Sequence, residues 1–190
     1  IDINDEDFNK LYDEHKEKSK AEKSLGNENM EIEVELNEFV GYENTESKSK
    51  IYQVETYDDK FIIFTEENPF YFEAGGQISD KGVITIDDTS IEVIDVFQAS
   101  NGATGLIVDS DIFKVDQEVE LSVNKSFRSG VSKSHTGAHI VHSALRNILG
   151  DHVAQAGSNV TPGKFRFDFS HTEKVSQEEL DEIFALSNSA

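Results

Sequence analysis

Cysteine and tryptophan are absent from this 190-residue sequence, which has one methionine and two prolines. Without cysteine, the chain has no disulfide bond and no catalytic thiolate, and a bound metal ion would be held by histidine, aspartate, glutamate or water. No hydrophobic run approaches the roughly 18 residues that a membrane-spanning helix needs. The first ten residues lack the basic and apolar stretches of a signal peptide, and no methionine starts the chain. We therefore expect a cytoplasmic protein with no membrane partner, of which this chain is one piece.

Basic residues are also scarce, because 17 lysines and arginines face 38 aspartates and glutamates, for a formal net charge of −21. Such a surface repels phosphate, which argues against nonspecific binding to nucleic acid. We expect no DNA partner. The charge is unevenly distributed: residues 125–190 are neutral as a whole, and residues 125–172 carry six basic and two acidic side chains. A polyanionic partner would therefore meet the C-terminal third of the chain.

The first two thirds of the chain predict one helix followed by many strands. Residues 5–24 carry a thin stripe of larger side chains at helical spacing between charged ones. The segment "MEIEVEL", residues 30–36, alternates apolar residues with glutamate, which is typical of a half-buried strand. Short alternating segments separated by turn residues continue to residue 124 and favour an antiparallel β-barrel or sandwich.

The last third has a different pattern. Residues 126–149 show helical spacing and are followed by a glycine, which is typical of a helix C-terminus. Residues 152–160 and 164–170 resemble two strands, and the second strand has three phenylalanines on one face. Ser176, three residues before Glu179, forms a capping-box pattern that predicts a helix running to the end.

Together these patterns predict the α+β class. We expect an N-terminal helix in a linker region over residues 1–28 and an antiparallel β-barrel over residues 29–124. Residues 125–190 would then form the first part of an α+β domain with a helix, a β-hairpin and a second helix, cut off by the end of the chain.

Three of the six histidines, His135, His139 and His142, lie within eight residues of the predicted long helix. Since each helical residue advances by about 100°, His135 and His139 lie roughly 40° apart and can reach one metal ion. The residues between them, 136–138, lack the glutamate base of the zinc metalloprotease helix, which excludes that class. Spacing alone equally allows ordinary packed or hydrogen-bonded histidines.

A second motif, "NPFYFEAGGQISDKGVI", occupies residues 68–84. The adjacent Gly75 and Gly76 permit positive φ angles and a close backbone approach to a ligand. Gln77 follows them and offers both a donor and an acceptor. By itself, this motif predicts a tight turn at the rim of the barrel.

A third motif, "HVAQAGSNVTPGKFRFDFSH", occupies residues 152–171 and by itself predicts only a hairpin. In this order and spacing, the three motifs resemble the editing region of the alanyl-tRNA synthetase family. The family pattern is Pro-Phe-Tyr-x-Glu-x-Gly-Gly-Gln-x-x-Asp-x-Gly, His-x-x-x-His-x-x-His, Gln-x-Gly-Ser and Arg-Phe-Asp-Phe-Ser-His. This sequence matches it at residues 69–82, 135–142, 155–158 and 166–171. The resemblance covers about residues 30–175.

The resemblance implies an enzyme that joins alanine to tRNA(Ala) with ATP and magnesium, and an editing region that hydrolyses tRNA wrongly charged with serine or glycine. It implies that His135 and His139 are zinc ligands, and that zinc assists the attack of water on the ester. Gln155 and Gln77 would be catalytic, positioning the ester or its water. The aminoacyl pocket would be bordered by Gly75, Gly76 and Ala138. The basic side chains that we expect to contact the tRNA acceptor end are Arg128, Lys133, Lys164 and Arg166.

The sequence departs from the family pattern at two points that matter for function. The family completes its zinc site with Cys-x-x-x-His farther along the chain, whereas this sequence has no cysteine and, after His139, only His142, His152 and His171. We therefore expect weak or absent zinc binding and little or no editing by this chain alone. Ala138 stands where many members have a hydroxyl residue, which puts the discrimination of serine from alanine in doubt.

Three alternatives remain open from the sequence. A freestanding aminoacyl-tRNA deacylase would share the barrel and the histidine helix and would begin near residue 30. Threonyl-tRNA synthetase shares His-x-x-x-His but lacks the Gly-Gly-Gln motif. A non-catalytic tRNA-binding module would not bind zinc and would not hydrolyse the ester. No obligate protein partner is expected in any of these cases.

Overall fold

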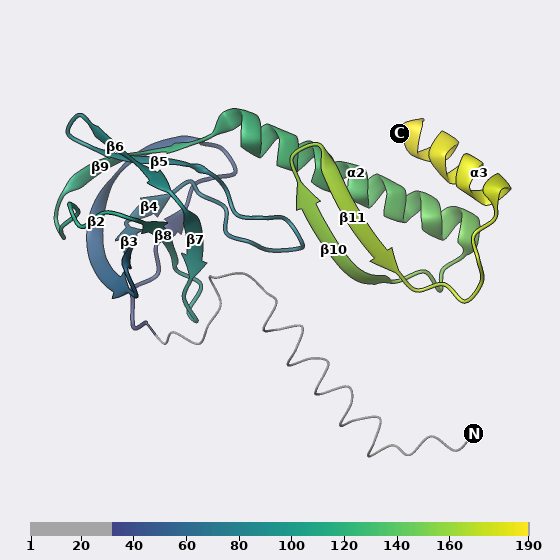
Figure 1. Ribbon diagram of the computed structural model, residues 1–190, viewed down its shortest axis with the longest axis horizontal. Coiled ribbons are helices and arrows are strands. Elements are labelled where there is room, and N and C mark those ends of the chain that lie inside the picture. The colour runs from purple at the N-terminus through teal and green to yellow at the C-terminus, as the bar shows by residue number, and fades with distance from the viewer. Residues whose placement is uncertain (1–31, 190) are drawn as a thin grey trace, which may run out of the picture.

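The computed structural model describes residues 32–189 of the chain. The helix predicted over residues 5–24 lies outside the described residues. Strands are the regular elements of the described chain up to residue 123, and two helices flank a β-hairpin beyond it (Figure 1). The predicted α+β class is confirmed.

Seven strands form one antiparallel sheet in the order β6-β5-β9-β2-β3-β8-β7. Two further short strands pair with each other in parallel. The strands of the large sheet are β2 (Glu46–Tyr57), β3 (Lys60–Thr65), β5 (Gly82–Ile86), β6 (Thr89–Val93), β7 (Asp95–Gln98), β8 (Thr104–Val108) and β9 (Glu118–Val123). The short pair consists of β1 (Glu38–Phe39) and β4 (Glu67–Asn68).

The sheet curls strongly but does not close into the predicted barrel. Strands β6 and β7 follow each other with only Ile94 between them, yet they form the two opposite edges of the sheet. Within residues 32–189 these edges do not pair with each other, and side chains bind polar groups beside the link between them. Lys81 Nζ donates to the carbonyl oxygen of Ile94 at 2.5 Å, and the Ser79 hydroxyl donates to the Asp95 carboxylate. The prediction of a closed barrel was therefore wrong.

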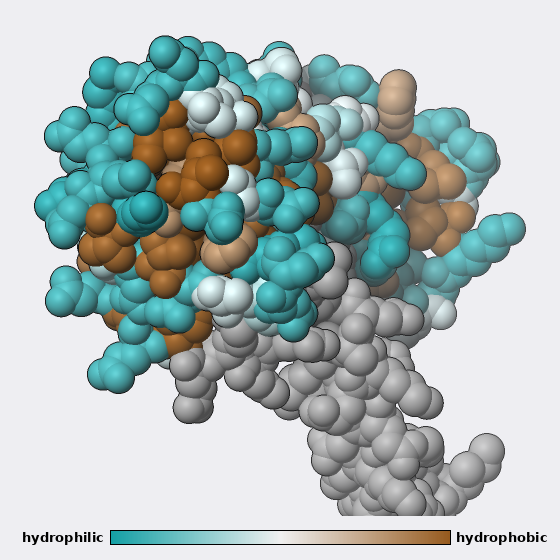
Figure 2. All heavy atoms as spheres, turned by 60° about the vertical axis from the view of Figure 1, so that its left-hand side comes forward, coloured by the Kyte–Doolittle hydropathy of each residue, from teal (hydrophilic) through white to brown (hydrophobic). Residues whose placement is uncertain are grey.

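The inside of the curled sheet holds the largest hydrophobic core of the described chain. The core is formed by buried side chains from most strands, among them Ile51, Ile63, Leu106 and Leu121, and by Phe70 from the segment after β4. Since successive strand residues point to opposite faces, the glutamates that alternate with these apolar residues lie outside. Figure 2 shows this outer face, where hydrophilic atoms surround smaller hydrophobic patches. The strong acidity of the sheet is thus mostly a property of its solvated exterior.

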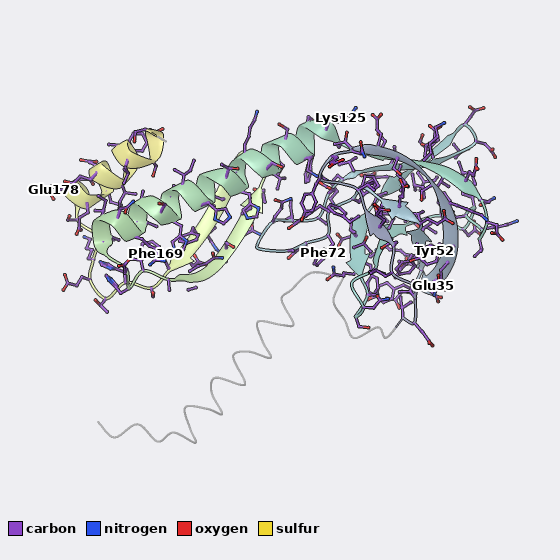
Figure 3. The ribbon with its side chains drawn as sticks, turned by 180° about the vertical axis from the view of Figure 1, so that it is seen from behind. Glu35, Tyr52, Phe72, Lys125, Phe169 and Glu178 are labelled. Atoms are coloured by element: carbon purple, nitrogen blue, oxygen red, sulfur yellow. The ribbon has the colours of Figure 1, made fainter. Side chains whose placement is uncertain are left out.

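Residues 32–37 do not form the strand predicted over residues 30–36. Ile32 and Val34 pack against a second core cluster around Phe64, so the alternation predicts their faces correctly. The backbone carbonyls, however, bind side chains in place of a neighbouring strand, and Figure 3 shows Tyr52 beside Glu35. The three bonds run from Tyr52 Oη to Glu35 O (2.6 Å), from Gln53 Nε2 to Glu33 O (3.0 Å) and from Asn101 Nδ2 to Val34 O (2.6 Å).

The C-terminal part is built around one long helix, α2 (Lys125–Leu149). Asn124 caps its first turn by accepting from the Phe127 backbone N–H, and Gly150 ends it as predicted. The hairpin of β10 (Gln155–Thr161) and β11 (Lys164–Phe169) lies along α2, and α3 (Gln177–Asn188) packs against α2 as well (Figure 1). Among the helices that the structure describes, none combines the length and the hydropathy needed to cross a bilayer.

Candidate functional site

The three sequence motifs meet where the sheet joins α2. The segment between β4 and β5, residues 69–81, is called the glycine loop below. It leaves the sheet near Phe72 and extends toward the hairpin (Figures 1 and 3). Two backbone hydrogen bonds between Ala74 and Gln77, of 3.1 and 3.0 Å, close its tip. Gly75 and Gly76 within the tip have φ angles of 62° and 79°, which favour glycine.

The tip of the glycine loop lies directly against β10. The Val160 backbone N–H donates to the Gly76 carbonyl at 2.7 Å, and the Ile78 N–H donates to the Val160 carbonyl at 3.3 Å. A Cβ atom at Gly76 would lie only 2.1 Å from Ser158 Oγ. Position 76 must therefore be glycine for the loop and the hairpin to come this close.

The buried side chain of Gln77 joins the glycine loop to α2. Its Oε1 lies 2.9 Å from His135 Nδ1. Because an amide oxygen only accepts, Nδ1 carries the proton and Nε2 keeps its lone pair. A Cβ atom at Gly75 would lie 3.9 Å from His135 Nε2, so this edge of the ring faces the glycine-rich tip. The loop thus sets both the tautomer and the surroundings of His135.

The second histidine of the motif lies beside the first, one turn later on α2. The ring centroids of His135 and His139 are 5.0 Å apart, with an angle of 17° between the planes. Burial lowers the pKa of His135, and the nearby His139 lowers it further. Both effects favour the neutral imidazole, which is the form that binds a metal ion.

These two imidazoles fit half of a four-ligand zinc set. A hydrogen bond from the non-ligating ring nitrogen to a side-chain oxygen, as in His135 and Gln77, is the usual support of a metal-binding histidine. Within residues 32–189, no group of three or more histidine, aspartate or glutamate side chains comes together to hold a metal ion. The described residues therefore offer two imidazoles that could bind a metal ion, and one side chain that supports them.

The hairpin contributes polar side chains next to the glycine loop. Gln155 Nε2 donates to Ser158 Oγ at 2.9 Å, and that hydroxyl lies 3.4 Å from the Gly75 carbonyl oxygen. Gln155 itself is exposed. The structure thus brings Gln155, Ser158 and the glycine loop into one hydrogen-bonded group. Sequence reasoning had placed Gln155 there by resemblance alone.

Two further residues of the histidine motif, Ala138 and His142, lie on α2. Ala138 is buried. The ring of His142 packs on Phe167 of β11 with centroids 4.8 Å apart. Its Nε2 is buried and, among the described residues, has no hydrogen-bond partner. His142 therefore supports the packing of the hairpin on the helix.

Of the four basic residues expected to contact tRNA, Arg128 differs from the other three. Its side chain is 15 % exposed, and its guanidinium donates to four oxygen atoms within the protein. Lys133 and Lys164 are exposed, and Arg166 is exposed beside Asp168. Arg128 therefore binds protein oxygens, Lys133 and Lys164 present their charge to solvent, and Arg166 pairs with an exposed carboxylate. Sequence reasoning missed its main partner, Asp80, although this aspartate belongs to the Gly-Gly-Gln-x-x-Asp pattern.

Comparison with known proteins agrees with this arrangement. The family model described as tRNA synthetases class II (A) matches residues 1–127. The chain is 36 % identical over 200 residues to the alanine–tRNA ligase of Caldicellulosiruptor saccharolyticus, covering 95 % of this chain and 23 % of the relative. The chain belongs to the alanyl-tRNA synthetase family. The predicted resemblance to alanyl-tRNA synthetases is thereby confirmed.

Other alanyl-tRNA synthetase relatives match in the same way. The alanine–tRNA ligase of Thermotoga petrophila is 32 % identical over 207 residues, covering 99 % of this chain and 24 % of the relative. The alanine–tRNA ligase of Oceanobacillus iheyensis is 40 % identical over 156 residues, covering 76 % of this chain and 18 % of the relative. The chain therefore spans about a quarter or less of the length of these alanyl-tRNA synthetases.

Proposed function

We propose that this chain forms part of the editing site of an alanine–tRNA ligase, which hydrolyses tRNA(Ala) wrongly charged with serine or glycine. The parent enzyme would join alanine to tRNA(Ala) with ATP and magnesium bound outside this chain. Residues 1–28 would be a linker, residues 29–124 a β-domain that supports editing, and residues 125–190 the first part of the editing domain itself.

The observation that carries this proposal is the contact between Gln77 and His135. It joins a glycine-rich loop of the sheet to a histidine pair on α2, 58 residues apart in the sequence. The same loop touches the hairpin that carries Gln155. A packing histidine would not need a buried amide that selects one tautomer, whereas a metal ligand does.

In this proposal His135 and His139 would hold zinc, with further ligands from outside residues 32–189. When bound, zinc would supply Lewis-acid assistance to ester hydrolysis. Gln77 keeps the proton on Nδ1 of His135 and so leaves Nε2 free. Gln155 is exposed beside the glycine loop, where its amide can position the aminoacyl ester. Water adds to the ester carbonyl, and the 3′-terminal hydroxyl of the tRNA leaves.

The tRNA would approach from the side of α2 and the hairpin. Lys133 on α2 and Lys164 at the hairpin turn are both exposed, and residues 125–172 carry more bases than acids. The acidic exterior of the sheet would repel the phosphates and so orient the acceptor end toward this region. Arg166 would also attract the phosphates, although the Asp168 carboxylate at 3.1 Å partly offsets its positive charge.

The test is hydrolysis of Ser-tRNA(Ala) and Gly-tRNA(Ala) by the natural gene product that contains this chain. His135→Gln is expected to lower the rate at least a hundredfold, an effect comparable to the loss of other catalytic groups. The matched control is His152→Gln. His152 stacks on His171 with centroids 5.0 Å apart, in the same way as the proposed ligands, but lies beyond the end of α2. This control should leave the rate unchanged.

We expect a different result for the isolated chain. The 190-residue chain should hydrolyse neither substrate appreciably, because its set of zinc ligands is incomplete. Equal rates for His135→Gln and the unmodified gene product would refute the zinc role. A gene product that binds no zinc and leaves both substrates intact would favour a non-catalytic tRNA-binding module.

A further inference from the structure

Arg128 and His135 lie on the same face of α2. They are seven residues apart, which is about two helical turns and roughly 10 Å along the axis. Because the helix between them is continuous, their separation is nearly rigid. Both side chains contact the glycine loop, but at different ends of it.

Arg128 binds the loop at its base. Its Nε lies 2.9 Å from both carboxylate oxygens of Asp80, and a second guanidinium nitrogen also pairs with that carboxylate. Two further bonds reach backbone carbonyls, of Gly41 at 2.6 Å and of Pro69 at 2.8 Å. The planar guanidinium thus fixes the direction of three chain segments at once, which a lysine ammonium would not do.

Asp80 in turn closes the loop. Its Oδ2 accepts from the Tyr71 backbone N–H at 2.8 Å, and its own N–H donates to the Tyr71 carbonyl at 3.0 Å. Tyr71 and Asp80 therefore form the neck of the loop, and Gln77 lies at its tip. The helix holds the neck through Arg128 and meets the tip at His135.

We propose that Arg128 and Asp80 are positioning residues for the histidine site. By anchoring the neck of the glycine loop on α2, they place the Gln77 amide so that it holds the His135 proton on Nδ1. The link from this geometry to editing rests on the proposed function, whereas the geometry itself does not.

The burial of the pair supports this role. Side-chain exposure is 15 % for Arg128 and 1 % for Asp80. Buried ion pairs add little net stability over apolar side chains of equal size, and a directional role is one documented reason for their presence. Arg146 of the same helix pairs with Asp151, which follows the helix, with exposures of 48 % and 96 % and one contact at 3.0 Å. That exposed pair provides a matched control.

The test reads the tautomer of His135 by long-range ¹H–¹⁵N NMR on the 190-residue chain at about pH 8, where an ordinary histidine is neutral. The unmodified chain should show the Nδ1–H form almost alone. Arg128→Lys keeps the charge but loses the planar guanidinium that anchors the loop. The ratio of Nδ1–H to Nε2–H should then fall roughly tenfold, the effect of losing one neutral hydrogen bond, here that between His135 and Gln77. Arg146→Lys should leave the ratio unchanged. An unchanged ratio in folded Arg128→Lys overturns the proposal.

Amide hydrogen exchange of the unmodified chain provides a second measurement that needs no variant. If the loop is held as one unit, the Tyr71 amide at the neck and the Gln77 amide at the tip should exchange with equal protection. A Gln77 amide that exchanges far faster than the Tyr71 amide would show that the tip moves independently, which also overturns the proposal. This measurement decides the matter even if Arg128→Lys fails to fold.

Neither measurement involves tRNA or zinc. A tautomer that responds to Arg128→Lys in a gene product without hydrolytic activity would support the positioning role and refute the editing role. The opposite result is active hydrolysis with a His135 tautomer ratio that does not change in Arg128→Lys. It would refute the positioning role alone.

Discussion

The side-chain oxygen of Gln77 lies 2.9 Å from Nδ1 of His135, joining a loop of the sheet to the long helix. A carboxylate at this position would stabilise the imidazolium. We therefore expect Gln77→Glu to raise the pKa of His135 by about one unit or more. NMR titration of the His135 ring measures the change. Gln155→Glu adds the same charge on the hairpin and is the control. Equal shifts in both variants would contradict the direct contact.

The lowered pKa of His135 also makes stability depend on pH. Burial is the main cause and the charge of His139 the second. Since the unfolded chain binds this proton more tightly, stability is highest above the ordinary pKa of about 6.5 and is lost as the pH falls through the window below it. Urea unfolding between pH 5 and 8 should show this loss, and His135→Asn should reduce it. If His135→Asn unfolds with the same pH dependence, the histidine does not contribute.

Gly76 and Gly163 offer a matched pair for testing the close approach of the glycine loop to the hairpin. Their φ angles are 79° and 73°, but a Cβ atom at Gly76 meets Ser158 Oγ at 2.1 Å, whereas nothing lies within 4 Å at Gly163. Gly163→Ala should cost about 1 kcal/mol of unfolding free energy from backbone strain alone. Gly76→Ala should cost about 2–3 kcal/mol, because the loop must move. Similar losses in both variants would argue against a tight contact.

Tyr52 binds residues 32–37 to the sheet. Its hydroxyl donates to the Glu35 carbonyl at 2.6 Å, and burial raises the pKa of Tyr52 to about 12. Tyr52→Phe should lower the free energy of unfolding by about 1 kcal/mol. In the unmodified chain, stability should fall as the pH rises from about 10 toward 12, because the unfolded tyrosine loses its proton first. Absorbance titration that places Tyr52 near pH 10 would contradict the buried contact.

The exposed lysines near the site should determine how RNA binding depends on salt. For a single-stranded RNA oligonucleotide, each lost phosphate contact reduces the slope of log K against log salt by about 0.7. Lys133→Gln and Lys164→Gln should each show this reduction in fluorescence anisotropy. Lys48→Gln is the control, because Lys48 pairs with Glu120 on the acidic sheet at 2.5 Å. A larger effect at Lys48 would place the RNA on the sheet.

Much of the secondary structure could be predicted from the sequence because its signals are local. The helical spacing of residues 126–149 and the capping box at Ser176 both correspond to elements of the structure. The alternation in residues 30–36 correctly indicates that Ile32 and Val34 pack against the sheet, but Leu36 is exposed. Nor does it predict that carbonyls there bind Tyr52 and other side chains. Whether an extended segment becomes a strand depends on its neighbours in space, which periodicity does not reveal.

Two other differences have the same origin. Whether the sheet closes depends on whether its edge strands β6 and β7 pair, and they do not pair within residues 32–189. The role of Arg128 depends on burial beside Asp80, whereas a sequence shows only its charge and suggests phosphate. In both cases, the deciding partner is remote in sequence or hidden by burial.

By itself, the sequence determined the α+β class, the histidine pair on one helical face and the membership in the alanyl-tRNA synthetase family, because residue order and spacing carry this information directly. Only the tertiary structure decided that Gln77 meets His135, that Gly76 lies against Ser158 and that Arg128 anchors the glycine loop. These contacts join separate elements, and they arise from packing the sheet, the helix and the hairpin together.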